Sequence, residues 1–309
     1  MSRRSILLGL LGDGVSASLS PLLHEAEGKA QGLALVYRTI DFSSAGLKRS
    51  ELAEVFRYAE ALGFDGLNVT HPYKFDVAGL VDEVDSHVSL LGASNTILFR
   101  DGRRIALNTD VAGFAAAFRR NLPEARLDRV AQLGAGGAGA AVACALLELG
   151  AQSIVFYDVD EARSAALIGK LQRRFPHRIL SMADSAAAAV CGADGVVNTT
   201  AVGMDGRGQS PLAVDLLGLR LWVADIIYMP PETALLAGAR DRGCRVMNGA
   251  EMLVFQAAYA FAHFTGQEAD AERMVRTFHE ETPPLRTSAR PSLESRFIRQ
   301  GAAPSPYRG

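Results

Sequence analysis

Residues 129–144 read RVAQLGAGGAGAAVAC, and this stretch decides the fold. Its first five residues are β-prone and mostly apolar, which predicts a buried strand. Gly134, Gly136 and Gly139 follow in the spacing GxGxxG, and a helix-forming run begins at Ala138. A strand, a glycine turn and a helix in this order begin a parallel βαβ unit, whose turn can hold a pyrophosphate at the helix N-terminus. A glycine-rich turn without a ligand is the alternative for this pattern.

An acidic residue follows the next predicted strand. Residues 153–158 end in Asp158, near the roughly 20-residue spacing at which a carboxylate meets the ribose 2′-hydroxyl of NAD. Asp158 and Asp160 would repel the 2′-phosphate of NADP, and Arg163 is the nearby compensating charge. The pattern therefore favours NAD over NADP. As an alternative or an additional role, Asp158 caps the helix that begins near Glu161.

Short β-like runs alternate with helical patterns along the rest of the chain, as in proteins built on parallel sheets. Asp101-Gly102 separates two β-prone runs and is a strong hairpin signal. The predicted strands cover 5–11, 36–41, 66–69, 95–100, 103–108, 129–133, 153–158, 195–199, 221–226 and 245–247. The predicted helices cover 21–31, 50–62, 111–119, 138–149, 161–174 and 251–265. Two such series in 309 residues predict an α/β fold with two domains.

Composition argues against several classes of protein. The chain is 49% hydrophobic and 21% charged, and its 32 basic residues nearly balance 34 acidic ones, so a general nucleic-acid surface is not expected. Three cysteines without a CxxC pair and six histidines without clustered spacing argue against a disulfide framework and a metal site. The sequence has no run of about 18 apolar residues that could span a membrane. We therefore expect a cytoplasmic protein that binds no metal, nucleic acid or membrane.

Small polar residues gather where the first series of predicted strands ends. Ligands of open α/β sheets bind outside the carboxyl ends of the strands, so these residues can converge on one crevice. They are Ser18, Ser20, Asn68, Thr70, Lys74, Ser94, Asn95, Thr96, Asn108, Thr109 and Asp110. A lysine paired with an aspartate can move a proton at a carbinol oxygen, which suits hydride transfer on a small polyhydroxylated acid. Considered alone, Lys74 also fits a solvated surface lysine, and Asp110 fits the N-cap of the next helix.

Eight motifs in this chain resemble those of the shikimate dehydrogenase family, in the same order and over roughly residues 5–280. They are Ser18-x-Ser20-Pro, Asn68-Val-Thr70-x-Pro-x-Lys74, Gly92-Ala-x-Asn95-Thr96, Asn108-Thr109-Asp110-x-x-Gly113, Gly134–Gly139, Asn198-Thr-Thr-x-x-Gly203-Met204, Asp225-Ile-Ile-Tyr228 and Gly249-x-x-Met252-Leu253-x-x-Gln256-Ala257. Each motif is modest alone, whereas eight in order are specific.

The resemblance implies an N-terminal α/β substrate-binding domain, a Rossmann-like NAD(P)-binding domain with a parallel sheet, and an active site between them. We place the first domain at 1–110 and the second at 111–247. Residues 248–281 would form C-terminal helices that return toward the first domain. Residues 282–309 hold five of the twelve prolines and are predicted to be a flexible tail. A short partner-binding motif at Leu293–Ile298 is the alternative for this tail.

The resemblance also implies roles for individual residues. Lys74 and Asp110 would form the acid–base pair at the reacting oxygen, and Ser18 and Ser20 would hold the substrate carboxylate. The other implied substrate contacts are Thr70, Asn95, Asp110, Tyr228 and Gln256. The residues expected at the cofactor are Gly134, Ala135, Gly136, Gly137, Ala138, Asp158, Arg163, Thr199, Ile226 and Gly249.

One departure from the family bears on the cofactor. NADP-using members carry an Asn-Arg-Ser/Thr run where this chain has Asp158-Val-Asp160, which resembles the NAD-dependent quinate/shikimate subgroup instead. The sequence thus predicts an oxidoreductase that interconverts shikimate and 3-dehydroshikimate with NAD. It leaves open NADP as cofactor, quinate as main substrate and a homodimer. A non-enzymatic NAD-linked binding protein and a methylene-tetrahydrofolate dehydrogenase are the alternatives from other classes.

Overall fold

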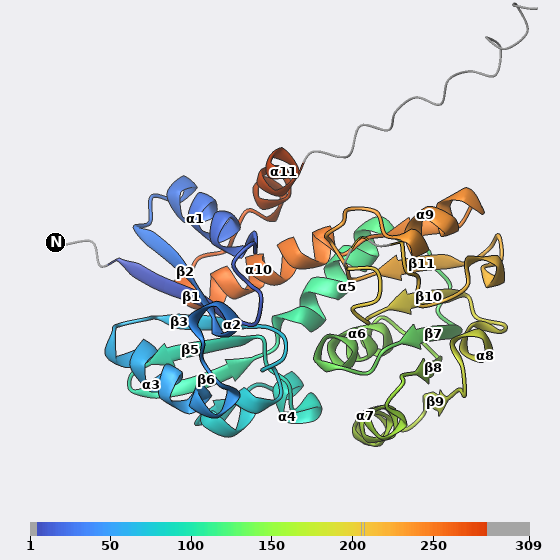
Figure 1. Cartoon of the computed structure of the whole chain (residues 1–309), viewed down its shortest axis with the longest axis horizontal. Coiled ribbons are helices and arrows are strands. Elements are labelled where there is room, and N and C mark those ends of the chain that lie inside the picture. Colours follow the sequence, from blue (N-terminus) through green and yellow to red (C-terminus); the bar gives the residue numbers. More distant parts are fainter. Residues whose placement is uncertain (1–4, 205, 207, 283–309) are drawn as a thin grey trace, which may run out of the picture.

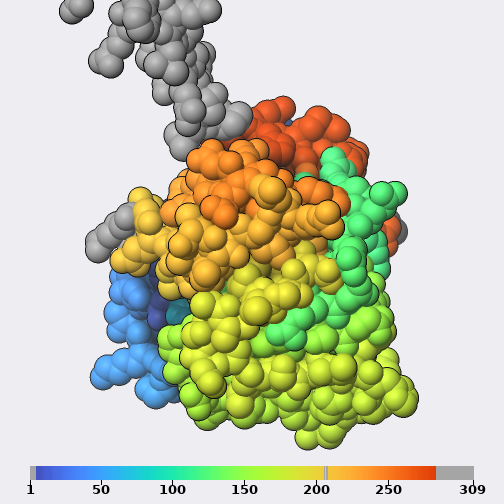
Figure 2. Space-filling model, turned by 90° about the vertical axis from the view of Figure 1, so that its right-hand side faces the viewer, coloured from blue at the N-terminus to red at the C-terminus, as the bar shows by residue number. Residues whose placement is uncertain are grey.

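Two six-stranded sheets lie side by side in the computed structural model, which describes residues 5–204, 206 and 208–282 (Figure 1). The first sheet is built from the N-terminal third of the chain and the second from the middle (Figure 1). In the end view of Figure 2, the green, yellow and orange segments of the second half form most of the surface, and the blue first half shows at one margin. This arrangement confirms the predicted α/β class with two packed units.

The first sheet is mixed and has the order β2-β1-β3-β5-β6-β4. Its strands are β1 (Ile6–Gly12), β2 (Leu35–Asp41), β3 (Gly66–Val69), β4 (Glu83–Val84), β5 (Thr96–Arg100) and β6 (Arg103–Leu107). The pairs are parallel except for β5, which runs antiparallel to both β3 and β6. The predicted hairpin joins β5 to β6 through Asp101 and Gly102, both at positive φ, as a tight hairpin turn requires.

The first sheet carries short helices on its connections. They are α1 (Ser20–Ala30), α2 (Phe42–Ala45), the 3₁₀ turn η1 (Arg49–Glu51), α3 (Leu52–Ala61), the 3₁₀ turn η2 (Asp76–Leu80) and α4 (Ser86–Leu91). The Asp85 side chain accepts the N–H of Val88 and so caps the first turn of α4, and Gly92 ends this helix in the left-handed conformation.

The second sheet is fully parallel and has the order β12-β11-β10-β7-β8-β9. Its strands are β7 (Arg129–Leu133), β8 (Ser153–Tyr157), β9 (Ile179–Met182), β10 (Gly195–Asn198), β11 (Trp222–Asp225) and β12 (Arg245–Met247). Its helices are α6 (Gly137–Glu148), α7 (Glu161–Arg174), α8 (Ala186–Val190), the 3₁₀ turn η3 (Val214–Leu216) and α9 (Ala234–Asp241). The strand order reverses between β7 and β10, which is the place where doubly wound sheets bind dinucleotides.

Two further helices, α5 (Thr109–Asn121) and α10 (Ala250–Thr265), connect the halves, and α11 (Ala271–Glu281) packs against α10 and α1. Figure 1 shows α5 and α10 between the two sheets, with α11 above α10. The two long helices touch at Gly113, where a Cβ atom would lie 2.7 Å from the Cβ of Gln256. A second contact ties α11 to the first half: Arg273 of α11 pairs with the buried Glu27 of α1 at 2.7 Å.

Two strands and several short helices escaped the sequence analysis. β4 has two residues, and β9 is a largely exposed edge strand without alternating hydrophobicity. The exact domain boundaries stay a prediction, and residues 283–309 of the predicted tail lie outside the described residues. Among the described residues, no helix is long and apolar enough to cross a membrane.

Candidate active site

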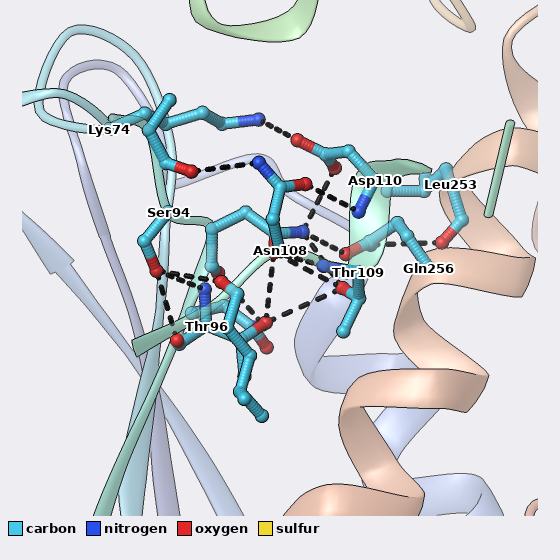
Figure 3. Close-up of polar contacts among 12 residues, drawn as sticks. Lys74, Ser94, Thr96, Asn108, Thr109, Asp110, Leu253 and Gln256 are labelled. Carbon is cyan, nitrogen blue, oxygen red and sulfur yellow. Dashed lines mark hydrogen bonds and ion pairs between the residues drawn. The ribbon is translucent and has the colours of Figure 1, made fainter. Parts of the chain in front are cut away.

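An ion pair between Lys74 and Asp110 lies at the centre of the candidate site. Lys74 follows β3 and Asp110 begins α5, and the Lys74 Nζ atom is 2.6 Å from Asp110 Oδ2. The side chains are only 15% and 6% exposed. The Asn108 side chain caps α5 by accepting the N–H of Asp110. The Asp110 carboxylate is therefore not needed as the N-cap and faces Lys74 instead (Figure 3).

The amide of Asn95 joins this pair to the rest of the site. Its Nδ2 lies 2.9 Å from Asp110 Oδ1, 2.9 Å from Thr109 Oγ1 and 3.2 Å from Gln256 Oε1. Its Oδ1 accepts the backbone N–H of Thr109 at 2.8 Å, which fixes the orientation of the amide. Asn95 precedes β5, Thr109 and Asp110 belong to α5, and Gln256 belongs to α10, so the network connects three elements (Figure 3).

Buried hydrogen bonds hold the loop that carries Lys74. The Ser94 N–H donates to the Lys74 carbonyl at 2.8 Å, and the Ser94 hydroxyl donates to the Leu107 carbonyl at 2.7 Å. Beneath them, Asn68 donates to Thr96 at 3.0 Å. Because these polar groups are buried and satisfied, they can fix the geometry of the pair rather than compete for a ligand.

Hydroxyl groups gather at the N-terminus of α1. The Ser18 Oγ lies 3.2 Å from the Ser20 Oγ. Burial raises the pKa of the Tyr228 hydroxyl, and a hydrogen bond with Ser18 acts in the opposite direction. The structure thus brings Ser18 and Ser20 of the first half together with Tyr228 of the second half. Thr70 lies directly after β3, and its N–H donates to the Leu11 carbonyl at 2.9 Å.

Asp41 holds the loop between β1 and α1, and the sequence analysis missed this residue. Its carboxylate accepts the N–H groups of Gly14 and Ser16 and the Ser16 hydroxyl, at 3.0, 3.2 and 2.7 Å. An acid at a strand end was the only signal for it, and such acids are common in turns.

The glycine turn has the shape that a dinucleotide requires. Gly134 has φ +100°, and a Cβ on Gly139 would lie 2.7 Å from the Gly134 carbonyl oxygen. Gly136 precedes α6 and offers no side-chain cap, so the first N–H groups of this helix can meet a phosphate. A Cβ on Gly136 would meet nothing within 4 Å, whereas a Cβ on Gly137 would lie 3.3 Å from the Lys74 Cβ. These residues fit a dinucleotide, and the first turn of α6, next to Lys74, would hold its phosphates.

Two carboxylates stand at the end of β8. Asp158 Oδ2 accepts the Ala135 N–H at 2.7 Å, and Asp158 Oδ1 accepts the Asp160 N–H at 2.9 Å. Asp160 caps α7 through the N–H of Arg163. The guanidinium of Arg163 lies 3.6 Å from Asp158 and 3.3 Å from Asp160, so its charge is engaged by both acids. Of the two aspartates, Asp160 is therefore the helix cap.

The other residues predicted to contact the cofactor lie at different places around the glycine turn and the start of α10. The Thr199 hydroxyl lies beneath it, 2.8 Å from the Leu133 carbonyl and 2.9 Å from that of Gly134. A Cβ on Gly249 would lie 2.0 Å from the Ile226 carbonyl oxygen, so this pair makes a close backbone contact. Ala138 lies in the first turn of α6.

Gln132 supports the turn and was also missed by the sequence analysis. It is fully buried, and its Nε2 donates to the carbonyls of Gly134 and Gly139 at 2.9 and 2.8 Å. A polar residue inside an apolar strand was the available signal for it.

A separate pocket of about 780 Å³ lies at the amino ends of β10, β11 and β12. Cys191, Trp222 and Arg245 are among its lining residues, and none of the predicted site residues lines it. The Lys74–Asp110 site is defined by its polar network and by the adjoining glycine turn rather than by this cavity.

Comparisons with known proteins show which proteins this chain resembles. Residues 10–97 match the family model described as shikimate dehydrogenase substrate binding domain, and 249–277 match that described as shikimate 5'-dehydrogenase C-terminal domain. The chain is 50% identical to the shikimate dehydrogenase (NADP(+)) of Pseudarthrobacter chlorophenolicus, over 91% of this chain and 97% of that protein. It is 43% identical to the quinate/shikimate dehydrogenase (NAD(+)) of Corynebacterium efficiens, over 90% and 99%.

Solved structures with the same architecture include proteins with either cofactor. Quinate dehydrogenase from Corynebacterium glutamicum in complex with NAD has a TM-score of 0.83 and 42% identity, covering 89% of this chain and 99% of that one. Shikimate 5-dehydrogenase from Thermus thermophilus in complex with NADP(H) and shikimate has a TM-score of 0.79 and 29% identity, with the same coverage of 89% and 99%.

Proposed function

This chain belongs to the shikimate dehydrogenase family, and from that premise we propose that it interconverts shikimate and 3-dehydroshikimate by hydride transfer with NAD. The observation that carries the proposal is the largely buried Lys74–Asp110 pair beside the glycine turn. A proton-transfer pair next to a dinucleotide-binding helix is the arrangement that alcohol oxidation by hydride transfer needs. Quinate is proposed as a second substrate.

Lys74 is proposed to move the proton at the reacting oxygen. In the oxidative direction the hydroxyl proton passes to the Lys74 amine, and in the reductive direction the Lys74 ammonium returns it to the carbonyl oxygen. Asp110 holds Nζ in place and stabilises its charged form. When bound, the nicotinamide cofactor supplies or accepts the hydride. The low exposure of both side chains limits the access of bulk water to the proton transfer.

The remaining polar groups suit a small acid with several hydroxyls. Ser18, Ser20 and Tyr228 offer hydroxyl donors for the substrate carboxylate. Asn95 and Gln256 offer amides on the other side of the ion pair and would bind ring hydroxyls, together with Thr70. Shikimate and quinate both present these groups, which is why both are proposed.

The preference for NAD rests on the acids after β8. The Asp158 side chain is 7% exposed and the nearby Asp160 side chain is 47% exposed. A ligand group bound at this strand end would therefore lie next to negatively charged carboxylates. Arg163 is engaged by both acids and is poorly placed to neutralise an added phosphate. A 2′-phosphate would therefore be repelled, whereas a 2′-hydroxyl can donate to a carboxylate.

The decisive assay follows reduced nicotinamide with shikimate and quinate against NAD and NADP. We expect the highest kcat/KM for shikimate with NAD and measurable turnover of quinate. Absence of turnover with either acid would overturn the enzymatic proposal, and binding of NAD alone would then favour the non-enzymatic binding protein. A higher kcat/KM with NADP would overturn the cofactor assignment, and a higher one with quinate would make quinate the main substrate.

A further inference from the structure

Three side chains of types that can ligate a metal meet at a contact between the two halves of the molecule. His87 belongs to α4 of the first half, while Cys144 and Glu148 lie one turn apart on α6 of the second. His87 Nε2 is 2.9 Å from Glu148 Oε1, and Cys144 Sγ is 3.8 Å from the same oxygen. The ligand atoms of all three lie within 4.8 Å of one another. His87 is far from the other two in sequence, so spacing gave no sign of this cluster.

The contact is built from apolar packing around these polar groups. Leu91 at the end of α4 is fully buried in the core that surrounds α6, and Leu90 packs against the same core. Lys170 of α7 donates to the Leu91 carbonyl at 2.7 Å. The chain connects the two halves through α5 and α10, so α4 against α6 and α7 is a non-covalent junction. A ligand shared between His87 and α6 would fasten this junction.

We propose that His87, Cys144 and Glu148 bind one thiophilic divalent cation, best represented by Zn²⁺, and that the bound ion ties α4 to α6. Imidazole, thiolate and carboxylate are the ligands that zinc takes, at about 2.0–2.3 Å. Atoms bound at those lengths in a tetrahedron stand roughly 3–4 Å apart, which is close to the present spacing. Water supplies the fourth ligand, since His87 is 27% and Glu148 41% exposed.

The cysteine decides which metals can bind. Cys144 is fully buried, and its Sγ atom is the sulfur ligand that the cluster offers. Mg²⁺ and Ca²⁺ prefer oxygen ligands, whereas this cluster offers one sulfur, one nitrogen and one carboxylate, so a thiophilic cation is expected instead. Arg174 places a positive charge near the cluster, and Asp85 a negative one. Asp85 is occupied by the N–H groups of Val88 and Asn108.

The test uses full-length, tag-free protein that has been treated with a chelator and dialysed. Titration with Co²⁺, followed by absorbance, should give a thiolate-to-cobalt charge-transfer band that saturates at one ion per chain. Calorimetry with Zn²⁺ should give the same stoichiometry, and Mg²⁺ should give no binding heat. Cys144→Ala should abolish the band, and His87→Gln and Glu148→Gln should each weaken Zn²⁺ binding by more than about tenfold.

Cys191→Ser is the matched control, because Cys191 is an exposed cysteine outside the cluster. It should keep the cobalt band and the Zn²⁺ affinity. The proposal is wrong if the band survives in Cys144→Ala or disappears in Cys191→Ser, or if His87→Gln binds Zn²⁺ as tightly as the unmodified chain. Absence of stoichiometric Zn²⁺ binding at micromolar metal would also overturn it. His87→Gln and Glu148→Gln alter partly exposed side chains, so they test the site even if Cys144→Ala does not fold.

Discussion

Lys74 is the residue on which the proposed chemistry depends. Replacing it with Ala removes the proton carrier and leaves the Asp110 carboxylate without its partner. We expect Lys74→Ala to lower kcat by about 10²–10⁴, the usual scale for loss of general acid–base catalysis, with a smaller change in KM. Steady-state kinetics with shikimate and NAD would measure this. Lys48→Ala, which removes an exposed lysine, is the control and should retain kcat; similar kinetics for both variants would contradict the role of Lys74.

Asp158 sets the cofactor preference in the proposed function. Asp158→Asn removes the negative charge but keeps an oxygen that can accept the Ala135 N–H. We expect the ratio of kcat/KM for NAD to that for NADP to fall by about tenfold or more, because the repulsion of the 2′-phosphate is lost. A tenfold change corresponds to about 1.4 kcal/mol. Asp184→Asn alters an exposed acid of the same half and should leave the ratio unchanged. An unchanged ratio in Asp158→Asn would mean that this carboxylate does not discriminate between the cofactors.

At the scale of elements, the crossing of α5 and α10 depends on a missing side chain. A Cβ on Gly113 would lie 2.7 Å from both the Cβ and the backbone N of Gln256. We expect Gly113→Ala to push the helices apart and to lower the free energy of unfolding by roughly 1–3 kcal/mol, measured by urea denaturation. Because Gln256 contacts Asn95, kcat/KM should fall as well.

Gly169→Ala is the matched control for this prediction. Gly169 lies inside α7, and a Cβ there would meet nothing within 4 Å. Alanine should therefore raise the free energy of unfolding by about 0.5–1 kcal/mol, because it favours the helix more than glycine does. If Gly113→Ala were as stable as Gly169→Ala, the close crossing would not constrain the fold.

The elements that the sequence predicted best have strong local signals. β7 and α7 have the predicted bounds, because β7 is apolar and followed by glycine, and α7 has the cap Asp160. α4 was missed because six residues are too few to show a helical period. The strand-end rule predicted that Lys74 and Asp110 converge, and their side chains form an ion pair.

Residues from distant elements were harder to predict. Gln256 entered only through the family resemblance, since nothing local shows that α10 reaches Asn95. The same reason hid the cluster at His87, which forms only when α4 packs on α6. In both cases the missing information is the packing of helices from different parts of the chain, which local patterns do not contain.

At the scale of the whole molecule, the dependence of stability on pH can be assigned to particular groups. Burial alone would raise the pKa of Glu27, but hydrogen bonds from Arg273, the Asp270 backbone and Gln31 outweigh it, so the pKa is lowered from 4.5. Its contribution to stability is present above 4.5 and is lost as the pH falls below that value. In the metal-free chain, the hydrogen bond to Glu148 raises the pKa of His87, whose contribution is complete below 6.5 and is lost as the pH rises through the folded value.

Between these two pH ranges, His24 contributes to the dependence of stability on pH. This histidine is fully buried between α1, β2 and α10, stacks on Tyr37 at 4.8 Å, and has no hydrogen-bond partner among the described residues. Burial lowers its pKa from 6.5 to about 3. Between these values the unfolded chain binds a proton that the folded chain does not, so stability is lost as the pH falls. The slope contributed by His24 approaches about 1.4 kcal/mol per pH unit.

His24→Leu tests this assignment. Leucine fills a similar volume among the rings of Tyr37, Phe261 and Phe264 and has no proton to bind. Urea denaturation at several values between pH 4.5 and 6.5 should show a flatter profile than the unmodified chain and a higher free energy of unfolding at the acidic end. His263→Leu removes an exposed histidine of α10 and should keep the original slope. Equal slopes for His24→Leu and the unmodified chain would show that a protonated His24 is tolerated inside the fold.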